Sequence, residues 1–247
     1  LPIFEEFFDD DEVVFSDIEN EKQNNEGVSQ KVSSLYFSGW SKKGLTIRMH
    51  QILKQMVCLL DALMVLQKNG IYHRDIKPDN LMVDKNGDVV VIDFGLATTQ
   101  VTKGHIAGTL DYMSPEACQG NFCEKSDLYS AGKIFFELLV LPDYNLFDVS
   151  NNATIDACSF RMNEFMLDQL EPLDRWAKFH NDKVIQSCVA LIQDMIAVRK
   201  TLLDKKVKAD PSNRIDLETA LKRCQEIAKL VGVEKKEWTS PGKQNVL

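Results

Sequence analysis

The feature that most constrains the fold is a short β-hairpin that carries a polar motif at each end. Two apolar runs, residues 81–84 and 89–93, are joined by the segment KNGD at 85–88. An Asn-Gly pair between apolar runs is the strongest short-range signal for a hairpin. Residues 73–80 before it read HRDIKPDN, and residues 93–95 at its end read DFG. Pairing of the strands therefore places the two motifs on neighbouring loops.

Four polar side chains in these motifs have the chemistry of a reactive site: Asp75, Lys77, Asn80 and Asp93. A carboxylate can accept or orient a proton, and a lysine can neutralise developing negative charge. Amide and carboxylate oxygens are ligands that suit Mg²⁺. An isolated Asp or Lys would indicate only a solvated surface, whereas four at this spacing indicate a site.

The two motifs resemble the catalytic loop and the metal-binding loop of eukaryotic-type Ser/Thr protein kinases. The resemblance implies ATP and Mg²⁺ as cofactors and a protein as the substrate. It implies that Asp75 is the catalytic base, that Lys77 steadies the transferred phosphoryl group, and that Asn80 and Asp93 hold the metal. A Lys two residues after the catalytic Asp is typical of Ser/Thr kinases rather than Tyr kinases.

Residues next to these four are expected to support them. The resemblance implies that His73 and Phe94 stack in an apolar column, with Gly95 completing the DFG motif. Met82 matches the position beneath the adenine ring of ATP, although its place on a buried strand is equally consistent with an ordinary core residue.

A second segment, residues 108–116, reads GTLDYMSPE and resembles the end of a kinase activation segment. Thr109 is then expected to hydrogen-bond to Asp75 and Lys77. Arg74 is typical of kinases that are switched on by a phosphate on this segment. The position usually phosphorylated is His105 here, so we select Thr102 as the possible phosphosite, with Thr98 and Thr99 as the other acceptors.

Three further residues are expected to have structural roles. Glu116 should form a buried ion pair with Arg214, and such pairs are costly to break. Asp127 should accept backbone N–H bonds from the catalytic loop.

Beyond the hairpin the sequence is mostly helical. Apolar residues recur at helical spacing over 46–69, which ends at an Asn-Gly stop signal. A second, largely apolar helix covers 127–140, with Ser126 or Asp127 as its cap. Further helical patterns occur over about 160–170, 183–204 and 216–231. The basic stretch 198–208 is interpreted as a solvated helix end and loop, with a docking surface as the alternative.

These elements predict an α+β, protein-kinase-like fold, in which a mostly helical C-lobe follows a remnant β-hairpin of the N-lobe. The predicted division is a partial N-lobe over 1–18, a hinge and polar insert over 19–45, the C-lobe over 46–232 and a flexible tail over 233–247. The first residue is not Met, so we expect a segment of a longer chain.

Composition restricts the class of partner and the compartment. The net charge of −8 argues against nucleic-acid binding, which requires a basic face. The six cysteines contain no Cys-x-x-Cys pair, which favours reduced thiols in the cytoplasm or nucleus. No apolar run suggests a membrane span.

The sequence has no glycine-rich phosphate loop and no Val-Ala-x-Lys strand before the catalytic loop. The hairpin at 1–18 would then expose a sheet edge and an apolar face. We expect either the rest of the same chain or a partner subunit to cover it. The 247-residue segment alone is expected to bind ATP poorly and to be inactive.

Three functions compete. The first is an active Ser/Thr protein kinase, and the second is a pseudokinase or structural subunit that has lost its grip on nucleotide. The third, a small-molecule or lipid kinase, is disfavoured because residues 108–116 build a peptide groove. Pseudokinases typically lose Asp75, Asn80 or Asp93, and all three are present, which favours the enzyme.

Overall fold

The computed structural model describes residues 42–101, 104–140, 155–200 and 207–234. The hairpin predicted for 1–18, most of the hinge and polar insert predicted for 19–45, and most of the tail lie outside these residues. The elements, in chain order, are α2 Lys42–Lys68, η2 Pro78–Asn80, β1 Leu81–Val83, β2 Val89–Val91, α3 Pro115–Cys118, α4 Ser126–Val140, α5 Ile155–Phe179, α6 Lys183–Ile196, β3 Val198–Lys200, β4 Val207–Ala209, η3 Pro211–Asn213 and α7 Leu217–Leu230.

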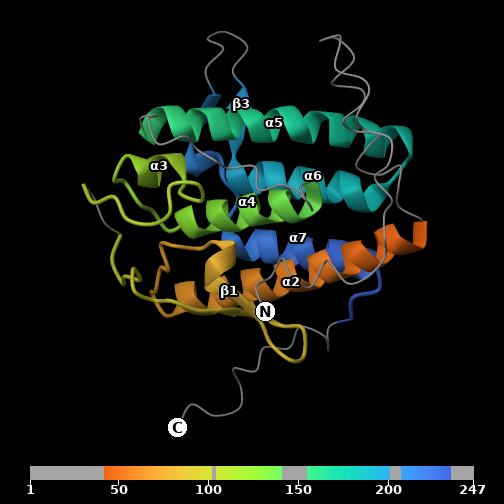
Figure 1. Cartoon of the computed structure of the whole chain (residues 1–247), viewed down its shortest axis with the longest axis horizontal. Coiled ribbons are helices and arrows are strands. Elements are labelled where there is room, and N and C mark those ends of the chain that lie inside the picture. The colour runs from red at the N-terminus through yellow and green to blue at the C-terminus, as the bar shows by residue number, and fades with distance from the viewer. Residues whose placement is uncertain (1–41, 102–103, 141–154, 201–206, 235–247) are drawn as a thin grey trace, which may run out of the picture.

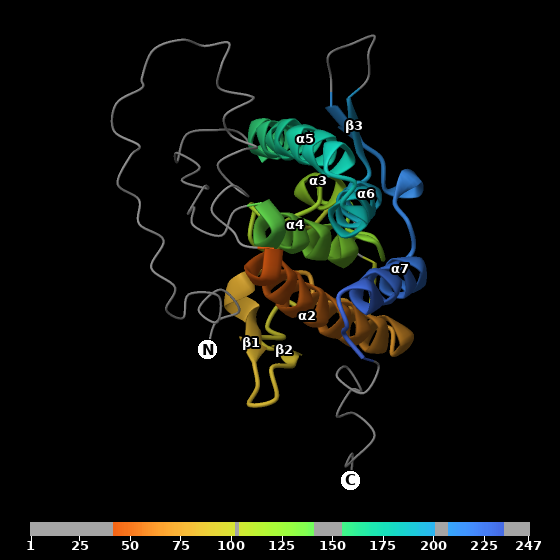
Figure 2. The same cartoon turned by 90° about the vertical axis from the view of Figure 1, so that its right-hand side faces the viewer.

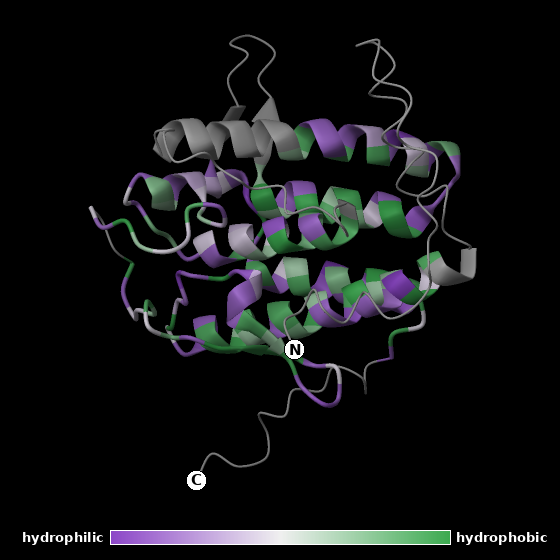
Figure 3. Cartoon of the chain, in the orientation of Figure 1, coloured by the Kyte–Doolittle hydropathy of each residue, from purple (hydrophilic) through white to green (hydrophobic). Residues whose placement is uncertain are grey.

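The helices form stacked layers around one apolar core. Helices α4 and α6 lie between α5 on one side and the pair α2 and α7 on the other (Figures 1 and 2). Apolar residues are frequent in α4 and α6 (Figure 3), as expected for helices covered on both faces. The core includes side chains with no exposed surface in three of these helices, such as Ile52, Phe135 and Ile192.

Helix α2 contains one stretch, Leu45–Lys68, that is long and apolar enough to cross a membrane by length and composition. Its apolar side chains Leu53, Met56 and Leu60 are fully buried against the rest of the domain. Core packing therefore accounts for the apolar character of this helix. The expectation that no apolar run suggests a membrane span therefore overlooked this stretch, which meets the criterion by length and composition alone.

The hairpin predicted around Asn-Gly is present. Strands β1 and β2 pair antiparallel with Met82 opposite Val90, and Gly87 adopts the left-handed conformation that the turn requires (φ 75°). The hairpin packs on α2, where Lys54 Nζ donates to the carbonyl oxygen of Asn86 at 2.7 Å. Its position fixes both motifs relative to the helical core.

Two helix predictions were wrong in detail. The helix predicted to run to residue 204 ends at Ile196, because Ala197 takes a left-handed conformation (φ 48°) and its N–H bonds to Gln193 O. The basic stretch 198–208 was predicted as a helix end and loop, but its described residues lie in β3 and β4, which pair antiparallel with Val198 opposite Ala209. β-Branched valines at 198 and 207 favour this extended structure.

The predicted cap of α4 was also wrong. The helix begins at Ser126, and the side chains of Ser126 and Asp127 bind neighbouring segments instead. Ser126 Oγ donates to Glu116 Oε1 at 2.9 Å, and Asp127 binds the loop before β1. Two polar residues at a helix start do not reveal whether they serve their own helix or another one.

Candidate active site

The loop that carries the HRD motif, residues 71–80, is fixed to α4 by one carboxylate. Asp127 accepts hydrogen bonds from the backbone N–H groups of His73 at 2.8 Å and Arg74 at 2.9 Å. These bonds hold Arg74 in a left-handed conformation (φ 69°) that is uncommon for a non-glycine residue. Burial raises the pKa of Asp127, and the two N–H bonds act in the opposite direction. Asp127 thus aligns the backbone directly before Asp75.

Asp75, Lys77 and Thr109 form one hydrogen-bonded group. Asp75 Oδ1 accepts from both the backbone N–H and the hydroxyl of Thr109 at 2.8 Å. Lys77 Nζ donates to Thr109 Oγ1 at 2.8 Å and lies 3.1 Å from Asp75 Oδ2. Partial burial raises the pKa of Asp75, but the bonds from Thr109 and Lys77 outweigh it, so the pKa is lowered. The carboxylate is therefore held in one orientation in its ionised form.

Asn80 and Asp93 approach this group from the two ends of the hairpin. Asn80 Nδ2 donates to the carbonyl oxygen of Asp75 at 2.8 Å and to Asp75 Oδ2 at 3.1 Å. The N–H of Ile92 donates to Asn80 O at 2.9 Å, which sets Asp93 beside the loop. Asp93 is exposed and left-handed (φ 59°). The structure thus brings together all four residues that the motifs single out.

The supporting residues lie around the same loop. His73 is fully buried, and its Nε2 donates to Ile92 O at 3.0 Å. Its ring meets Phe94 edge-on, with 5.0 Å between ring centroids. The Gly95 N–H donates to Asp93 Oδ1 at 3.2 Å, and Met82 is half-buried on β1.

The side-chain oxygen atoms of Asn80 and Asp93 suit the Mg²⁺ ion that the motifs imply. Asn80 uses its amide nitrogen toward Asp75, so its amide oxygen is the atom that a hard cation would meet, together with the carboxylate of exposed Asp93. Among the described residues there is no cluster of three or more His, Cys, Asp or Glu side chains that could hold a metal. A magnesium ion that also binds phosphate oxygens needs only one or two protein ligands.

The segment that leads to Glu116 closes over the catalytic loop at Gly108. This glycine has φ 118°, and a Cβ there would lie 2.5 Å from the carbonyl oxygen of Arg74. Only glycine allows the two backbones to approach so closely. Thr109, the next residue, is thereby delivered to Asp75.

Glu116 and Arg214 form an ion pair beneath this segment. Arg214 Nη1 lies 2.8 Å from Glu116 Oε1, and the arginine side chain has no exposed surface. Burial raises the pKa of Glu116, but the hydrogen bonds and charge of Arg214 outweigh it, so the pKa is lowered. The pair joins the end of the activation segment to the chain before α7.

The proposed phosphosite, Thr102, lies outside the described residues and stays a prediction. Arg74, its expected partner, has its guanidinium 5.7 Å from the ring centroid of Phe122. Within the described part of the chain, Arg74 Nε and Nη2 are buried and donate no hydrogen bond.

Sequence reasoning missed one group at the site. Lys133 and Glu137 of α4 are almost fully buried beside Tyr112. The only signal in the sequence is a charged pair four residues apart in a helix that is otherwise apolar, and such a pair is usually solvated.

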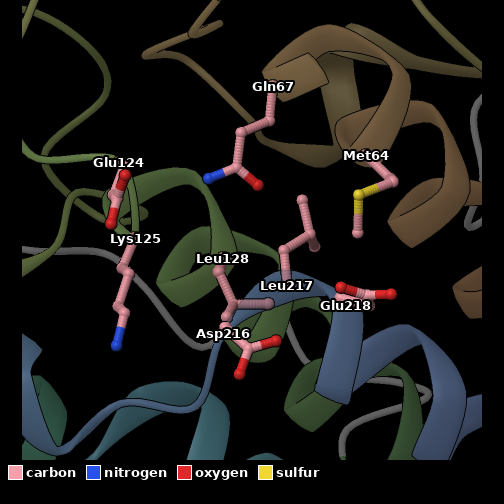
Figure 4. Close-up of a pocket in the computed structure, with 8 residues that line it drawn as sticks. All are labelled: Met64, Gln67, Glu124, Lys125, Leu128, Asp216, Leu217 and Glu218. Carbon is pink, nitrogen blue, oxygen red and sulfur yellow. The ribbon is translucent and has the colours of Figure 1, made fainter.

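A pocket of about 250 Å³ lies elsewhere, between the end of α2 and the starts of α4 and α7 (Figure 4). Met64, Leu128 and Leu217 supply apolar walls, and charged side chains such as Glu124 and Glu218 line it as well. None of the motif residues contributes to this pocket, so it is separate from the candidate active site.

Comparison with known proteins identifies the class of protein that this fold and site define. The model of the protein kinase domain family matches residues 13–224. The chain therefore belongs to the protein kinase domain family, and its described part is mostly helical with two small two-stranded sheets.

Individual relatives are Ser/Thr kinases. A probable Ser/Thr protein kinase of Streptomyces coelicolor is 40% identical over 97 residues, which are 36% of this chain and 14% of that protein. The Ser/Thr kinase PknL of Mycobacterium tuberculosis is 38% identical over 96 residues, 36% of this chain and 24% of that protein. The probable Ser/Thr kinase WNK9 of rice is 33% identical over 126 residues, 49% of this chain and 30% of that protein. The matches thus span less than a third of each relative's length.

Proposed function

We propose that the protein transfers the γ-phosphoryl group of MgATP to a Ser or Thr hydroxyl of a protein substrate. One observation carries the proposal: the Asp75 carboxylate is held ionised by Thr109, beside the ammonium group of Lys77. Kinship with Ser/Thr kinases supports the same reaction class.

The residues of the chain have distinct tasks in this reaction. Asp75 accepts the hydrogen bond of the attacking hydroxyl and orients its oxygen toward the phosphorus. Lys77, fixed by Thr109, places positive charge where the transferred phosphoryl group passes. Magnesium bound to oxygens of Asn80 and Asp93 would supply further positive charge against the phosphates. Transfer is direct and in line, so no covalent enzyme intermediate is expected.

The acceptor is proposed to be a protein because residues 108–116 resemble the end of the activation segment of Ser/Thr protein kinases, and the chain belongs to the protein kinase domain family. Gly108 and Thr109 join this segment to the catalytic loop, and Glu116 joins it to the chain before α7. An intracellular location, cytoplasmic or nuclear, is part of the proposal. It is supported by the five cysteines of the described residues, all of which are free thiols.

The alternative is a pseudokinase or a structural subunit of a larger assembly. It is favoured by four residues on and after β2 that expose apolar surface, which a partner or another part of the protein would cover: Val90, Ile92, Phe94 and Leu96. This function keeps the fold and uses it for binding rather than for transfer.

The substitution Asp75→Asn in the full protein distinguishes an active kinase from the pseudokinase or structural alternative. It keeps the size of the side chain and an acceptor for Thr109 but removes the negative charge. We expect kcat for peptide phosphorylation to fall by about 100-fold or more, since a positioned acid or base contributes roughly that factor. The control is Asp174→Asn, at a surface ion pair of α5, which should keep full activity.

Radiolabelled phosphate transfer to a Ser/Thr peptide library measures both variants. Activity of Asp75→Asn equal to that of the unmodified protein would contradict the proposed mechanism. A lack of transfer by the unmodified protein, together with binding of a partner protein, would support the structural alternative.

A further inference from the structure

Lys133 occupies an unusual place for a lysine. It lies in the middle of α4 and is followed by the largely apolar sequence IFFELLV. Its side chain has no exposed surface. Burying an ammonium group is costly unless an opposite charge accompanies it. Glu137, one turn further along and 5% exposed, supplies that charge from the same helix.

One face of α4 contacts a single tyrosine of the activation segment. Ser130 Oγ donates to the carbonyl oxygen of Tyr112 at 2.7 Å. Lys133 Nζ lies 4.8 Å from the centroid of the Tyr112 ring, within the range of a cation–π contact. The Tyr112 hydroxyl donates to Glu137 Oε2 at 2.9 Å. Positions 130, 133 and 137 share one helical face, so backbone, ring and hydroxyl of Tyr112 are all held by α4.

Tyr112 in turn is joined to the catalytic carboxylate. Its N–H donates to the carbonyl oxygen of Thr109 at 3.0 Å, and the N–H of Thr109 donates to Asp75 Oδ1 at 2.8 Å. A continuous series of contacts therefore runs from Lys133 through Tyr112 and Thr109 to Asp75.

We propose that Lys133 is a positioning residue for phosphoryl transfer: its buried ammonium group holds Tyr112 and Glu137 in place and so fixes the turn that orients Asp75. The inference rests on the proposed function for its kinetic consequences. The positioning itself is a property of the fold and can be measured without any reaction.

The positioning of Tyr112 and Glu137 requires Lys133 to carry its positive charge. Burial lowers the pKa of Lys133 to about 8, while the nearby charges of Glu137 and Asp111 and the thiol of Cys118 act in the opposite direction. Burial likewise raises the pKa of Glu137 to about 7, with Lys133 and the Tyr112 hydroxyl opposing it. Near neutral pH the ammonium form holds both groups, and it is lost as pH rises through about 8.

The test uses Lys133→Met, which keeps the volume of the side chain and removes its charge. Its matched control is Leu138→Met, at another buried position of the same helix. The first readout is hydrogen exchange of the Thr109 and Tyr112 amides. We expect their protection to fall about tenfold in Lys133→Met and to stay unchanged in Leu138→Met.

The second readout is kinetic. In Lys133→Met we expect kcat to fall about tenfold while KM for ATP stays within twofold. We expect the activity of the unmodified protein to decline as pH rises through about 8, and this decline should be missing in Lys133→Met. The double variant Lys133→Met/Glu137→Gln removes both charges and keeps an acceptor for the Tyr112 hydroxyl, so it should recover most of the exchange protection and of kcat.

Equal exchange protection at Thr109 in Lys133→Met and Leu138→Met would overturn the inference, whatever the kinetics. A loss of activity that only follows the loss of thermal stability would overturn it too. If the unmodified protein transfers no phosphate, the proposed function fails, and the exchange measurement alone still decides whether Lys133 positions Asp75.

Discussion

At the scale of single residues, Glu116 and Arg214 show how a charge pair can join distant parts of the chain. The two residues are 98 positions apart, and both are largely buried. Arg214 Nη1 also donates to the carbonyl oxygen of Lys125, and Lys125 Nζ donates to the carbonyl oxygen of Arg214 at 2.6 Å. The guanidinium thus joins the activation segment, the start of α4 and the chain before α7.

Removing one partner should therefore be costly. In Glu116→Gln we expect the free energy of unfolding to fall by about 3 kcal/mol, because Arg214 keeps a buried charge without a counter-charge. Urea unfolding followed by circular dichroism measures the change. The control is Glu171→Gln, in an exposed pair with Arg175, where the loss should be at most about 1 kcal/mol.

The same ion pair makes the free energy of unfolding depend on pH, and the lowered pKa of Glu116 sets the sign of that dependence. A carboxyl group with a lowered pKa in the folded state stabilises the fold fully above its ordinary pKa of 4.5, and that contribution is lost as pH falls through the lowered value. The stability difference between the unmodified protein and Glu116→Gln should therefore shrink in acid below pH 4.5. A difference that stays constant down to pH 2 would show that charge is not its cause.

The residues of the site were predictable from sequence where they lie close together in the chain. Asp75, Lys77 and Asn80 lie within one short loop, and the hairpin brings Asp93 to it. Lys133 could not be predicted, since its role depends on which helical face meets Tyr112, and only tertiary packing decides that.

At the scale of elements, glycine signals predicted where the chain turns, while other helix boundaries were predicted less well: α2 was predicted to begin at residue 46 and begins at Lys42. The Asn-Gly signal correctly predicted the end of α2: Gly70 is left-handed (φ 67°), and the N–H of Ile71 donates to Leu66 O at 2.9 Å. The end of α6 was mispredicted because Ala197, unlike glycine, gives no sign in sequence that it will adopt a left-handed conformation. The pairing of β3 with β4 was not predicted, although valines at 198 and 207 favour extended structure, because the basic residues between them were interpreted as a solvated helix end and loop.

The contact between α4 and α6 depends on Gly132. A Cβ at this position would lie 2.9 Å from Met195 Cβ and 3.1 Å from Ile196 Cγ2. Ala has the higher helix propensity by about 1 kcal/mol, but overpacking costs about 1–3 kcal/mol. We therefore expect Gly132→Ala to lower the free energy of unfolding by about 1 kcal/mol, measured by urea unfolding.

A graded series separates steric crowding from helix propensity. Gly132→Val should destabilise more than Gly132→Ala, while Gln51→Ala at an exposed site of α2 should change stability by less than about 0.5 kcal/mol. If Gly132→Ala proved more stable than the unmodified protein, the close approach of α4 to α6 would be refuted.

At the scale of the whole molecule, the helices share one core while one surface around the hairpin stays apolar. Val90, Ile92, Phe94 and Leu96 are each more than a third exposed. From the sequence we expect a hairpin over 1–18 whose apolar face is covered by the rest of the chain or by a partner subunit. Those residues lie outside the described part, so this expectation stays a prediction.

A single core has a consequence for how the domain unfolds. Helix α5 packs on α6 through buried side chains such as Met166 and Leu170, and Trp176 on α5 lies partly buried against the same core. Loss of α4 or α6 would remove the surface on which α5 rests. We therefore expect the fluorescence of Trp176 and the helical circular dichroism signal to change in one cooperative transition.

The three tryptophans make this measurable. In a Trp40→Phe/Trp238→Phe variant, Trp176 becomes the only tryptophan of the chain, and its fluorescence reports on α5. The urea midpoints from fluorescence and from circular dichroism should then agree within about 0.2 M, well inside the breadth set by m values of roughly 1–3 kcal/mol/M. A separate fluorescence transition at lower urea would mean that α5 detaches before the core unfolds. Helix α5 would then unfold independently of the catalytic loop. Coincident transitions would mean that the same packing of α4 and α6 holds both α5 and the catalytic loop.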